Sequence, residues 1–317
     1  MPSPSTVHID TPLTNVAIRG FNTGVGEVAD LIFPVVPVAK QTDKYYTFTK
    51  ATFLRIPSTI RDRKSASGRI DWQISSDSYY CRGFGLAAEY PTEDIANADQ
   101  IVALRETHAT NVAETLARDR ARRVARLVSS GGNLGSGATL SGTTLWSDYM
   151  NSDPIANVTT GHAYIRNNTG FDGANIAITT RDVLDIVRRH PDLLDMYKYT
   201  AGGMLNDAQL ATVFGVERII IGTGIVENAL EGGTSSITNI WPNNFILARI
   251  NPVQGAQTAT LGLQFRWTNP ELGQPFAIQR DRFDQAGTNH TEVVEARYWQ
   301  DEKIVAAELG YVIQTAI

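Results

Sequence analysis

The strongest pattern along the chain is an apolar stripe at helical spacing between residues 97 and 129. Its members lie mostly three, four or seven positions apart, with no proline or glycine between them: Ile101, Leu104, His108, Val112, Leu116, Val124 and Leu127. Asn97 and Gln100 have the spacing of a capping box, and Gly131 ends the run. The pattern predicts a helix about 45–50 Å long, which is more than a compact enzyme domain usually needs.

Residues 44–82 have the pattern of a long β-hairpin. Strand-forming side chains mark both arms: Tyr45, Tyr46, Phe48 and Phe53 on the first, and Trp72, Ile74, Tyr79 and Tyr80 on the second. The segment between them, 61–69, is polar, highly charged and contains Gly68. Because a core element cannot have that composition, we predict a loop that projects from the body.

Shorter elements surround these two. The first thirty residues are rich in Pro, Ser, Thr and Asn and predict an extended arm, and the two prolines in 32–38 indicate an edge or wrapping segment. Residues 133–145 predict a Gly/Ser/Thr linker. Helices are expected at 154–168, closed by Gly170, at 180–187 and from 206 onward. Strands are expected at 176–178, 218–221, 244–250, 293–299 and 304–313.

Composition narrows the class of protein. The chain has 317 residues, a formal charge of −5, 42% hydrophobic residues and 19% charged residues, so it can form a sizeable core and is not disordered. A net-acidic chain is a poor candidate for a dedicated nucleic-acid binder. The single cysteine, Cys81, excludes an intrachain disulfide and a cysteine-based zinc site. Neither a membrane-spanning stretch nor a secretory signal is found, so we expect a soluble protein in a reducing compartment, without a membrane partner.

Candidate chemistry is sparse. Residues 219–228 have a strand-like run followed by Gly-x-Gly, as at a dinucleotide site, but Glu227 stands where the third glycine should be. His190 with Asp192 and Asp195 imitates a metal site, although a turn after a helix explains the three better. We therefore expect no catalytic residues, no metal and no cofactor.

Five arginines crowd the last third of the long helix: Arg118, Arg120, Arg122, Arg123 and Arg126. Complementarity with the helix dipole and a solvated face explain part of this pattern. A subunit contact or proximity to a polyanion explains the rest, and Arg118, Arg122, Arg123 and Arg126 are the candidate residues for such a basic face.

Several stretches, taken in their order along the chain, resemble tailed-phage major capsid proteins of the Hong Kong 97 type. They are 153–157 and 165–170, then 182–184 with 189–192, then 210–216 and 219–224, and finally 239–244, 295–299 and Gly310-Tyr311. The resemblance covers residues 31–317. It implies an α+β fold of the Hong Kong 97 type. Its parts would be an N-terminal arm (1–30), an arm-to-E-loop segment (31–90) whose long hairpin at 44–82 is the E-loop, a P-domain with a long spine helix and linker (91–145), an A-domain (146–285) and a returning P-domain β segment (286–317).

The resemblance also implies a structural role. Copies would form hexamers and pentamers of an icosahedral shell around double-stranded DNA, assembled in the host cytoplasm. A portal, a separate scaffolding protein and a decoration protein are the other expected partners. We expect no covalent crosslinking. The glycine turn at 222–224 and a helix after it would be internal scaffold. As a hypothesis, the loop residues Arg61, Arg63, Lys64 and Arg69 pair with acidic groups on an adjacent subunit.

Three alternatives stay open at this stage. An encapsulin-like nanocompartment shares the fold and would contain cargo in place of a genome. A tail or head-completion protein would form a ring. A nucleotide-binding oxidoreductase would use the turn at 222–224.

Overall fold

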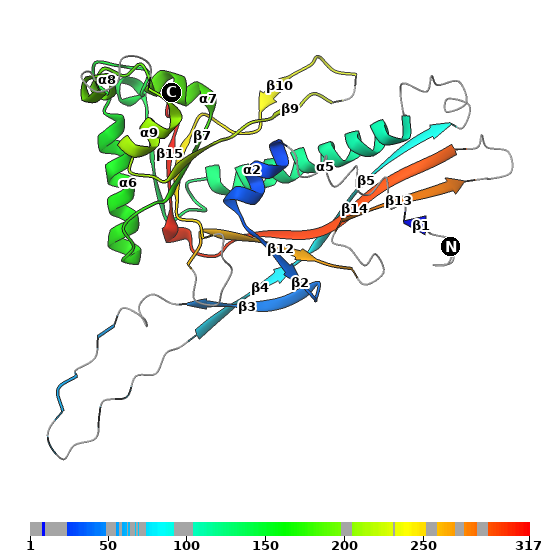
Figure 1. Ribbon diagram of the computed structural model, residues 1–317, viewed down its shortest axis with the longest axis horizontal. Helices are drawn as coiled ribbons and strands as arrows, with labels where there is room; N and C mark the ends of the chain where they lie inside the picture. Colours follow the sequence, from blue (N-terminus) through cyan, green and yellow to red (C-terminus); the bar gives the residue numbers. More distant parts are fainter. Residues whose placement is uncertain are drawn as a thin grey trace.

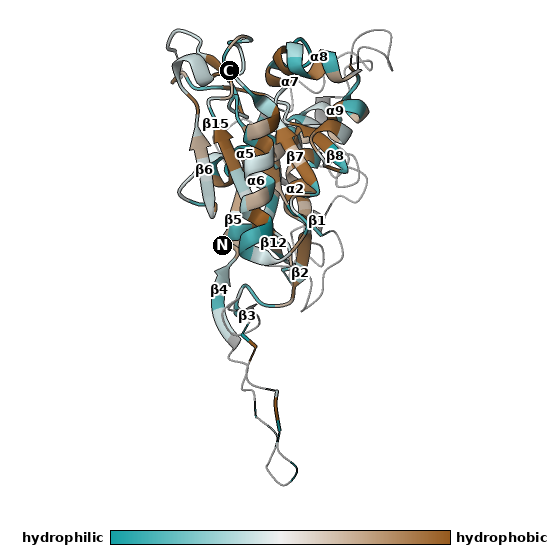
Figure 2. Cartoon of the chain, turned by 90° about the vertical axis from the view of Figure 1, so that its left-hand side faces the viewer, coloured by the Kyte–Doolittle hydropathy of each residue, from teal (hydrophilic) through white to brown (hydrophobic). Residues whose placement is uncertain are grey.

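The computed structural model describes residues 8–9, 24–48, 55–56, 59–61, 63, 67, 69, 74–91, 104–197, 205–230, 232–251, 259–269, 276–283 and 291–317. A body of helices and a short sheet lies at one end, a long sheet with one long helix extends from it, and a hairpin projects below (Figure 1). Seen end on, the apolar residues concentrate in the body and the long sheet above the hairpin (Figure 2).

The long sheet is centred on β14 (Thr291–Ile304), which pairs with β13 (Phe276–Phe283), β12 (Gly262–Trp267) and β5 (Arg82–Pro91). Strand β1 (His8–Ile9) continues the sheet beyond β13, and β2 (Val35–Val38) continues it beyond β12. Alternate residues of β14 are buried from Glu292 to Gln300, as expected of a strand with one covered face. Helix α5 (Leu104–Ser129) covers that face, where Val112 and Leu116 pack against Val294 and Tyr298.

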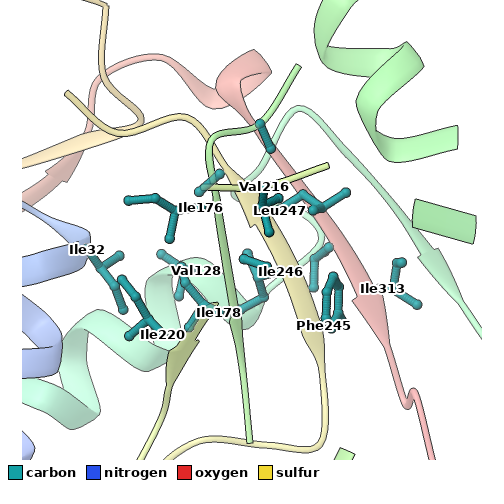
Figure 3. Close-up of a cluster of buried hydrophobic side chains, with 14 of the residues drawn as sticks. Ile32, Val128, Ile176, Ile178, Val216, Ile220, Phe245, Ile246, Leu247 and Ile313 are labelled. Carbon is teal, nitrogen blue, oxygen red and sulfur yellow. The ribbon is translucent and has the colours of Figure 1, made fainter. Parts of the chain in front are cut away.

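The body is built on a second sheet, with the order β6 (Ser136–Thr139), β15 (Gly310–Gln314), β11 (Phe245–Ala248), β7 (Ile176–Thr179) and β8 (Arg218–Ile221). Every residue of β7 and β11 is buried. Around this sheet lie four helices: α6 (Pro154–Thr169), α7 (Arg181–Val187), α8 (Pro191–Tyr197) and α9 (Asp207–Val213). Figure 3 shows the resulting apolar cluster, in which Val128 from the end of α5 meets Ile178, Ile220 and Ile246. Helix α5 therefore connects the hydrophobic core of the body with the core on the covered face of the long sheet.

Local sequence signals explain where the body helices begin and end. The Asp153 carboxylate accepts a hydrogen bond from the Ala156 amide (2.9 Å) at the start of α6, and Gly170 ends that helix at φ 76°. Asn206 and Gln209 form a reciprocal capping box on α9. Gly161 lets α6 approach the sheet, since a Cβ there would lie 2.5 Å from Leu247.

Two small antiparallel hairpins complete the fold. Strands β3 (Thr42–Phe48) and β4 (Ile74–Tyr80) form the base of the projecting hairpin, and β9 (Ile225–Glu227) with β10 (Ile237–Asn239) forms the other. Short 3-10 turns lie at η2 (Gly142–Thr144) and η3 (Ala307–Leu309).

Much of the predicted secondary structure is confirmed. The long helix is present over 104–129, while residues 97–103 and their caps lie outside the described residues. The pairing of the two strands at the base of the predicted hairpin and the edge position of 35–38 are also confirmed. So are the helices at 154–169, 181–187 and 207–213 and the strands at 176–179, 218–221 and 245–248.

Four expectations are wrong. The arm does not extend to residue 30, because helix α2 (Val25–Ile32) buries Val28, Ala29 and Ile32. The expected linker contains strand β6, in which Gly137 allows close approach to β15, because a Cβ at this position would lie 2.7 Å from Val312. The glycine turn at 222–224 leads into strand β9 rather than a helix. Residues 304–313 do not form one strand, because η3 separates the end of β14 from β15.

The two sheets draw their strands from both sides of the expected division at 285/286. Strands β12 and β13, from the segment assigned to the A-domain, belong to the long sheet with β14. Strand β15, from the segment assigned to the P-domain, lies in the centre of the body sheet.

Candidate functional site

The base of the projecting hairpin is firmly attached to the long sheet. The Tyr79 ring stacks on Phe265 with centroids 4.6 Å apart, and the Tyr45 ring also contacts Phe265. The Tyr80 amide donates to the Asp301 carboxylate (3.0 Å), and burial raises the pKa of that carboxyl. These contacts fix the direction in which the hairpin leaves the body.

The residues described in the loop of this hairpin face solvent. Arg61, Arg63 and Arg69 are exposed, as predicted for a projecting tip, and the Arg61 guanidinium lies 3.4 Å from the Ser67 hydroxyl. Lys64, the fourth candidate contact, lies outside the described residues. Exposed basic side chains on a projecting loop are accessible to a neighbouring molecule.

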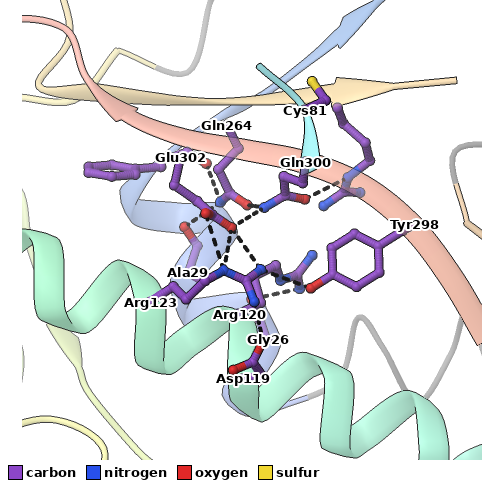
Figure 4. Close-up of polar contacts among 12 residues, drawn as sticks. Gly26, Ala29, Cys81, Asp119, Arg120, Arg123, Gln264, Tyr298, Gln300 and Glu302 are labelled. Carbon is purple, nitrogen blue, oxygen red and sulfur yellow. Dashed lines mark hydrogen bonds and ion pairs between the residues drawn. The ribbon is translucent and has the colours of Figure 1, made fainter. Parts of the chain in front are cut away.

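A group of buried and partly buried polar side chains joins α2 and α5 to the long sheet (Figure 4). We call it the polar junction; it consists of Asp30, Arg120, Arg123, Gln264, Gln300 and Glu302. The Arg120 side chain is fully buried, donates to the Gly26 carbonyl (3.0 Å) and pairs with Asp30 (3.2 Å). Burial lowers the pKa of Arg120 to about 10, against the opposing attraction of Asp30, so the group keeps its charge at neutral pH.

Two glutamines continue the junction through the sheet. The Gln264 side-chain amide donates to the carbonyls of Ala29 (2.9 Å) and Phe33 (2.7 Å) at the end of α2. The Gln300 amide donates to Gln264 and to Glu302 (2.9 Å). Helix α2 is therefore held to β12 and β14 by directional bonds as well as by its apolar face.

Arg123 connects α5 to the same strand. Its guanidinium bonds Glu302 (2.9 and 3.2 Å) and the Tyr298 hydroxyl (2.9 Å), pairs with Asp119, and lies 3.8 Å from the centre of the Phe84 ring. Burial alone would lower the pKa of Arg123, but the bonds to Glu302 and Tyr298 outweigh it and raise the pKa above the ordinary arginine value.

The predicted basic face of α5 is thus only partly formed. Arg118 and Arg126 are exposed, and Arg122 is half-buried and donates to the Asn228 side chain (2.9 Å) beside β9. Arg123 points into the protein and does not belong to that face. The helical phase indicates this in retrospect: Arg120 lies four residues after Leu116 and four before Val124, on the buried stripe.

Ser152, His190 and Asp192 form an arrangement with the appearance of a catalytic triad. The Ser152 hydroxyl lies 3.1 Å from His190 Nε2, and His190 Nδ1 lies 3.6 Å from Asp192. However, the hydroxyl donates its proton to the Asp148 carbonyl (2.7 Å), so Nε2 must be the donor towards the hydroxyl oxygen. In that tautomer the histidine does not activate the serine, and both side chains are buried. The bonds of Ser152 to Asp148 and His190 hold the segment just before α6 in place.

The glycine turn at 222–224 has no space for a dinucleotide. A Cβ on Gly222 would lie 2.5 Å from Trp241, and one on Gly224 would lie 2.8 Å from Val25. Since the strand–turn–helix that holds a pyrophosphate is also replaced by a turn into β9, the oxidoreductase alternative loses its site.

Other chemistry finds no support in the described residues. Cys81 is fully buried, and burial raises the pKa of its thiol to about 11, so it is no nucleophile. No described group of three or more His, Cys, Asp or Glu side chains is arranged to hold a metal ion. Within the same residues, no helix has the length and apolar character needed to cross a membrane.

Two curated proteins resemble the sequence over most of its length. The chain is 28% identical over 314 residues to a "Major capsid protein" of Pseudomonas phage JBD67, a match that covers 98% of this chain and 97% of the relative. It is 26% identical over 255 residues to a "Major capsid protein" of Burkholderia phage BcepMu, with 80% of each chain covered. No family model matches the sequence.

Solved structures share the fold. A phage-related protein from Bordetella bronchiseptica superposes with a TM-score of 0.73, at 23% identity and 98% coverage of each chain. A subunit of the capsid of cyanophage P-SCSP1u superposes with a TM-score of 0.60 at 6% identity, over 89% of this chain and 86% of that one. The described fold is therefore that of phage capsid subunits, in agreement with the expected Hong Kong 97-type class.

Proposed function

From the similarity to two phage major capsid proteins, over 98% and 80% of the chain, and from the fold, we infer that this chain is a major capsid protein, a structural subunit of a phage head and not an enzyme. The observation that carries this conclusion is the 28% identity over 98% of the chain to a protein of that name. The His190 tautomer, which does not activate Ser152, and the glycine turn, which is filled by Trp241 and Val25, agree with it.

Copies of this chain assemble into hexamers and pentamers that close an icosahedral shell around double-stranded DNA. A shell subunit needs surfaces that are left without partners in the single chain, and the described loop residues 55–56, 59–61 and 63 are such a surface. Binding to DNA strengthens with each phosphate that a protein neutralises. A chain with an overall charge of −5 therefore does not bind DNA strongly over its whole surface, which suits a container for DNA. Attraction to the genome is then local.

Two basic surfaces are candidates for specific contacts. The loop residues Arg61, Arg63, Lys64 and Arg69 contact an adjacent subunit. Arg118, Arg122 and Arg126 on the outer side of α5 face either packaged DNA or a subunit, and their spacing of four residues places them on one side of the helix. Arg123 is removed from this set because it bonds Glu302.

The remaining partners follow from the proposed role. Assembly in the host cytoplasm would involve a portal and a separate scaffolding protein, and a decoration protein could bind the finished shell. An encapsulin-like shell shares this architecture, but both curated relatives are named as phage capsid proteins, which favours the phage head.

Negative-stain electron microscopy tests the proposal. The purified protein, produced alone and together with the neighbouring genes of its phage, should form closed particles tens of nanometres across. Species no larger than a tetramer in every preparation would contradict the shell. Closed particles that purify with an enzyme cargo and without DNA would support the encapsulin-like nanocompartment instead.

A further inference from the structure

Strand β5 forms an open edge of the long sheet. It pairs with β14 through ten consecutive residues in one unbroken register, and β14 is the only described strand that pairs with it. Figure 1 shows β5 in cyan beside β14 and under α5. Within the part of the chain that the structure describes, the backbone amide and carbonyl groups of β5 that point away from β14 have no backbone partner. Such a row of unpaired groups is a template for a further strand.

The other described edges of the two main sheets are short or interrupted, and β5 is neither. Strand β1 has two residues, β6 and β8 have four each, and β2 has four with Pro37 among them. Natural edge strands are usually kept short, or are blunted by proline, lysine or a bulge. Strand β5 has ten residues, no lysine, and a proline only at its last position. An edge of this length and composition is expected where a strand of another chain is added.

On the sheet face away from α5, the side chains of β5 are small enough for close pairing. Gly83, Gly85 and Ala87 lie on this face, and all three are exposed. A Cβ on Gly83 would lie 2.9 Å from the Trp299 ring, and one on Gly85 would lie 3.1 Å from the Arg297 side chain. Two large side chains of β14 therefore lie over the glycines, and β5 itself stays flat on this face.

On the face towards α5, β5 presents an apolar row. Phe84 and Ala88 pack against the core between α5 and β14, and the Phe84 ring stacks on Tyr298 with centroids 5.4 Å apart. Leu86 lies between them on the same face and is 38% exposed. A second apolar row along the open edge would remove Leu86 from water, which is favourable in proportion to the area covered.

An antiparallel copy of β5 is complementary to this edge in size and in charge. If Leu86 faces its own copy, Phe84 of each chain faces Ala88 of the other, so a large side chain meets a small one on both sides of the centre. The only charged residues of the strand are Arg82 near one end and Glu89 near the other. Antiparallel pairing brings each of them to within one position of the opposite charge on the second chain, with no like charges face to face.

We propose that β5 of one subunit pairs antiparallel with β5 of a second copy, with Leu86 at the two-fold axis. The two long sheets then form one continuous sheet, with helix α5 of each subunit on the same face. Contact of one patch with itself is isologous, whereas a ring of five identical chains is closed by head-to-tail contacts. The pairing therefore joins subunits of different rings, and in this respect it rests on the proposed function.

Disulfide trapping in assembled shells tests the pairing. Residues that face each other on antiparallel strands have Cα atoms about 4.5–5.5 Å apart, which a disulfide can span. After oxidation with copper phenanthroline, more than about half of a Leu86→Cys variant should run as a covalent dimer on a non-reducing gel. The matched control is Glu89→Cys on the same strand, whose copy lies six residues away, at about 20 Å, and which should give almost no dimer. The fully buried Cys81 adds no link.

A second pair of variants tests the same register without changing Leu86. Shells assembled from a mixture of Phe84→Cys and Ala88→Cys subunits should give covalent dimers, because these positions face each other. Shells of either variant alone should not, since each position then lies four residues, or about 13 Å, from its own copy.

Electron microscopy of the same samples distinguishes a wrong contact from a wrong function. Wild-type shells, with dimers from Leu86→Cys or from the 84/88 mixture and few from Glu89→Cys, would support the pairing. Wild-type shells with no dimers from either test, or with as many from Glu89→Cys, would overturn the pairing and leave the capsid function intact. In that case, protection of the thiol at position 86 from maleimide would show that a different segment covers the edge. No particles from the wild-type protein would overturn the function and the shell contact together.

Discussion

The arginines on the two sides of helix α5 have different tasks, although the sequence presents them as one cluster. Arg120 and Arg123 lie on the inner side, with Asp30 and Glu302 as partners. Arg118 and Arg126 lie on the outer side in solvent, where Arg118 pairs with Glu114 at 3.4 Å. The comparison teaches that arginines of one helix stabilise the subunit where they are buried and paired, and remain accessible to other molecules where they are exposed.

The inner side also differs from the apolar core of the body. Apolar packing among β7, β11 and α7 is non-directional, whereas the polar junction fixes how α2 and α5 lie on the long sheet. A subunit that must fit its neighbours benefits from such directional contacts at the place where its two cores meet.

The largest expected effect concerns exposed charge alone. Reversing two loop charges, Arg61→Glu with Arg63→Glu, should reduce the yield of closed shells at least about tenfold, because the new glutamates would repel the acidic groups expected on the adjacent subunit. The melting temperature of the unassembled subunit should not change. The measurement is particle counting by electron microscopy beside a thermal melt, and a normal number of shells would contradict the contact.

A smaller effect is expected from the inner side. Glu302→Ala leaves the Arg123 guanidinium buried without its main partner and should lower the free energy of unfolding by about 3 kcal/mol. Denaturant titration of the unassembled subunit measures this. Glu302→Gln should lose less, since it keeps an acceptor for Arg123. The exposed counterpart Glu114→Ala should change the free energy by less than about 0.5 kcal/mol, and equal losses at 302 and 114 would refute the division between the two sides.

The pH dependence of the hairpin base gives a third, smaller effect. Burial raises the pKa of Asp301 in the folded protein. Folding is then favoured while the group is protonated, below its unfolded pKa of about 3.9. That contribution is lost as the pH rises through the folded value. Asp301→Asn keeps an acceptor for the Tyr80 amide, so it should stabilise the subunit at pH 7 by less than about 1 kcal/mol, with no gain at pH 3.5. Thermal melts at both pH values decide this, and a loss at pH 7 would show that Asp301 is needed as an anion.

The smallest effect on stability is expected for the outer side of α5. Arg118→Ala with Arg126→Ala should leave the free energy of unfolding within about 0.5 kcal/mol of the wild-type value. If this side faces the genome, filled particles should release DNA more readily on heating, while shell number stays the same. A large loss of stability would place these arginines with Arg120 and Arg123.

The sequence predicted the parts of the fold in which local signals agree. The stripe up to Leu127, the helix that begins at 154 and ends at Gly170, the helix start at Asn206 and the aromatic hairpin arms each depend on neighbouring residues. Helix α2 and strand β6 were missed because both contain glycines that resemble turn signals in the sequence. Gly24 and Gly26 lie at the start of α2, and Gly137 lies in β6 where a Cβ would be 2.7 Å from Val312.

The candidate site was only half predictable for the same reason. Exposure of Arg61 and Arg63 follows from loop composition. The inward direction of Arg123 depends on Glu302, which is 179 residues away in the sequence. The stripe position of Arg120 was a local signal that the arginine count obscured.

Cryo-electron microscopy of the particles formed by the wild-type protein tests the central claim most directly. The account predicts a closed shell in which identical chains surround fivefold and sixfold positions, with the projecting loop of each chain against an adjacent chain. Purified protein that stays monomeric or dimeric with all its phage partners present would contradict the claim that this chain is the subunit of a capsid.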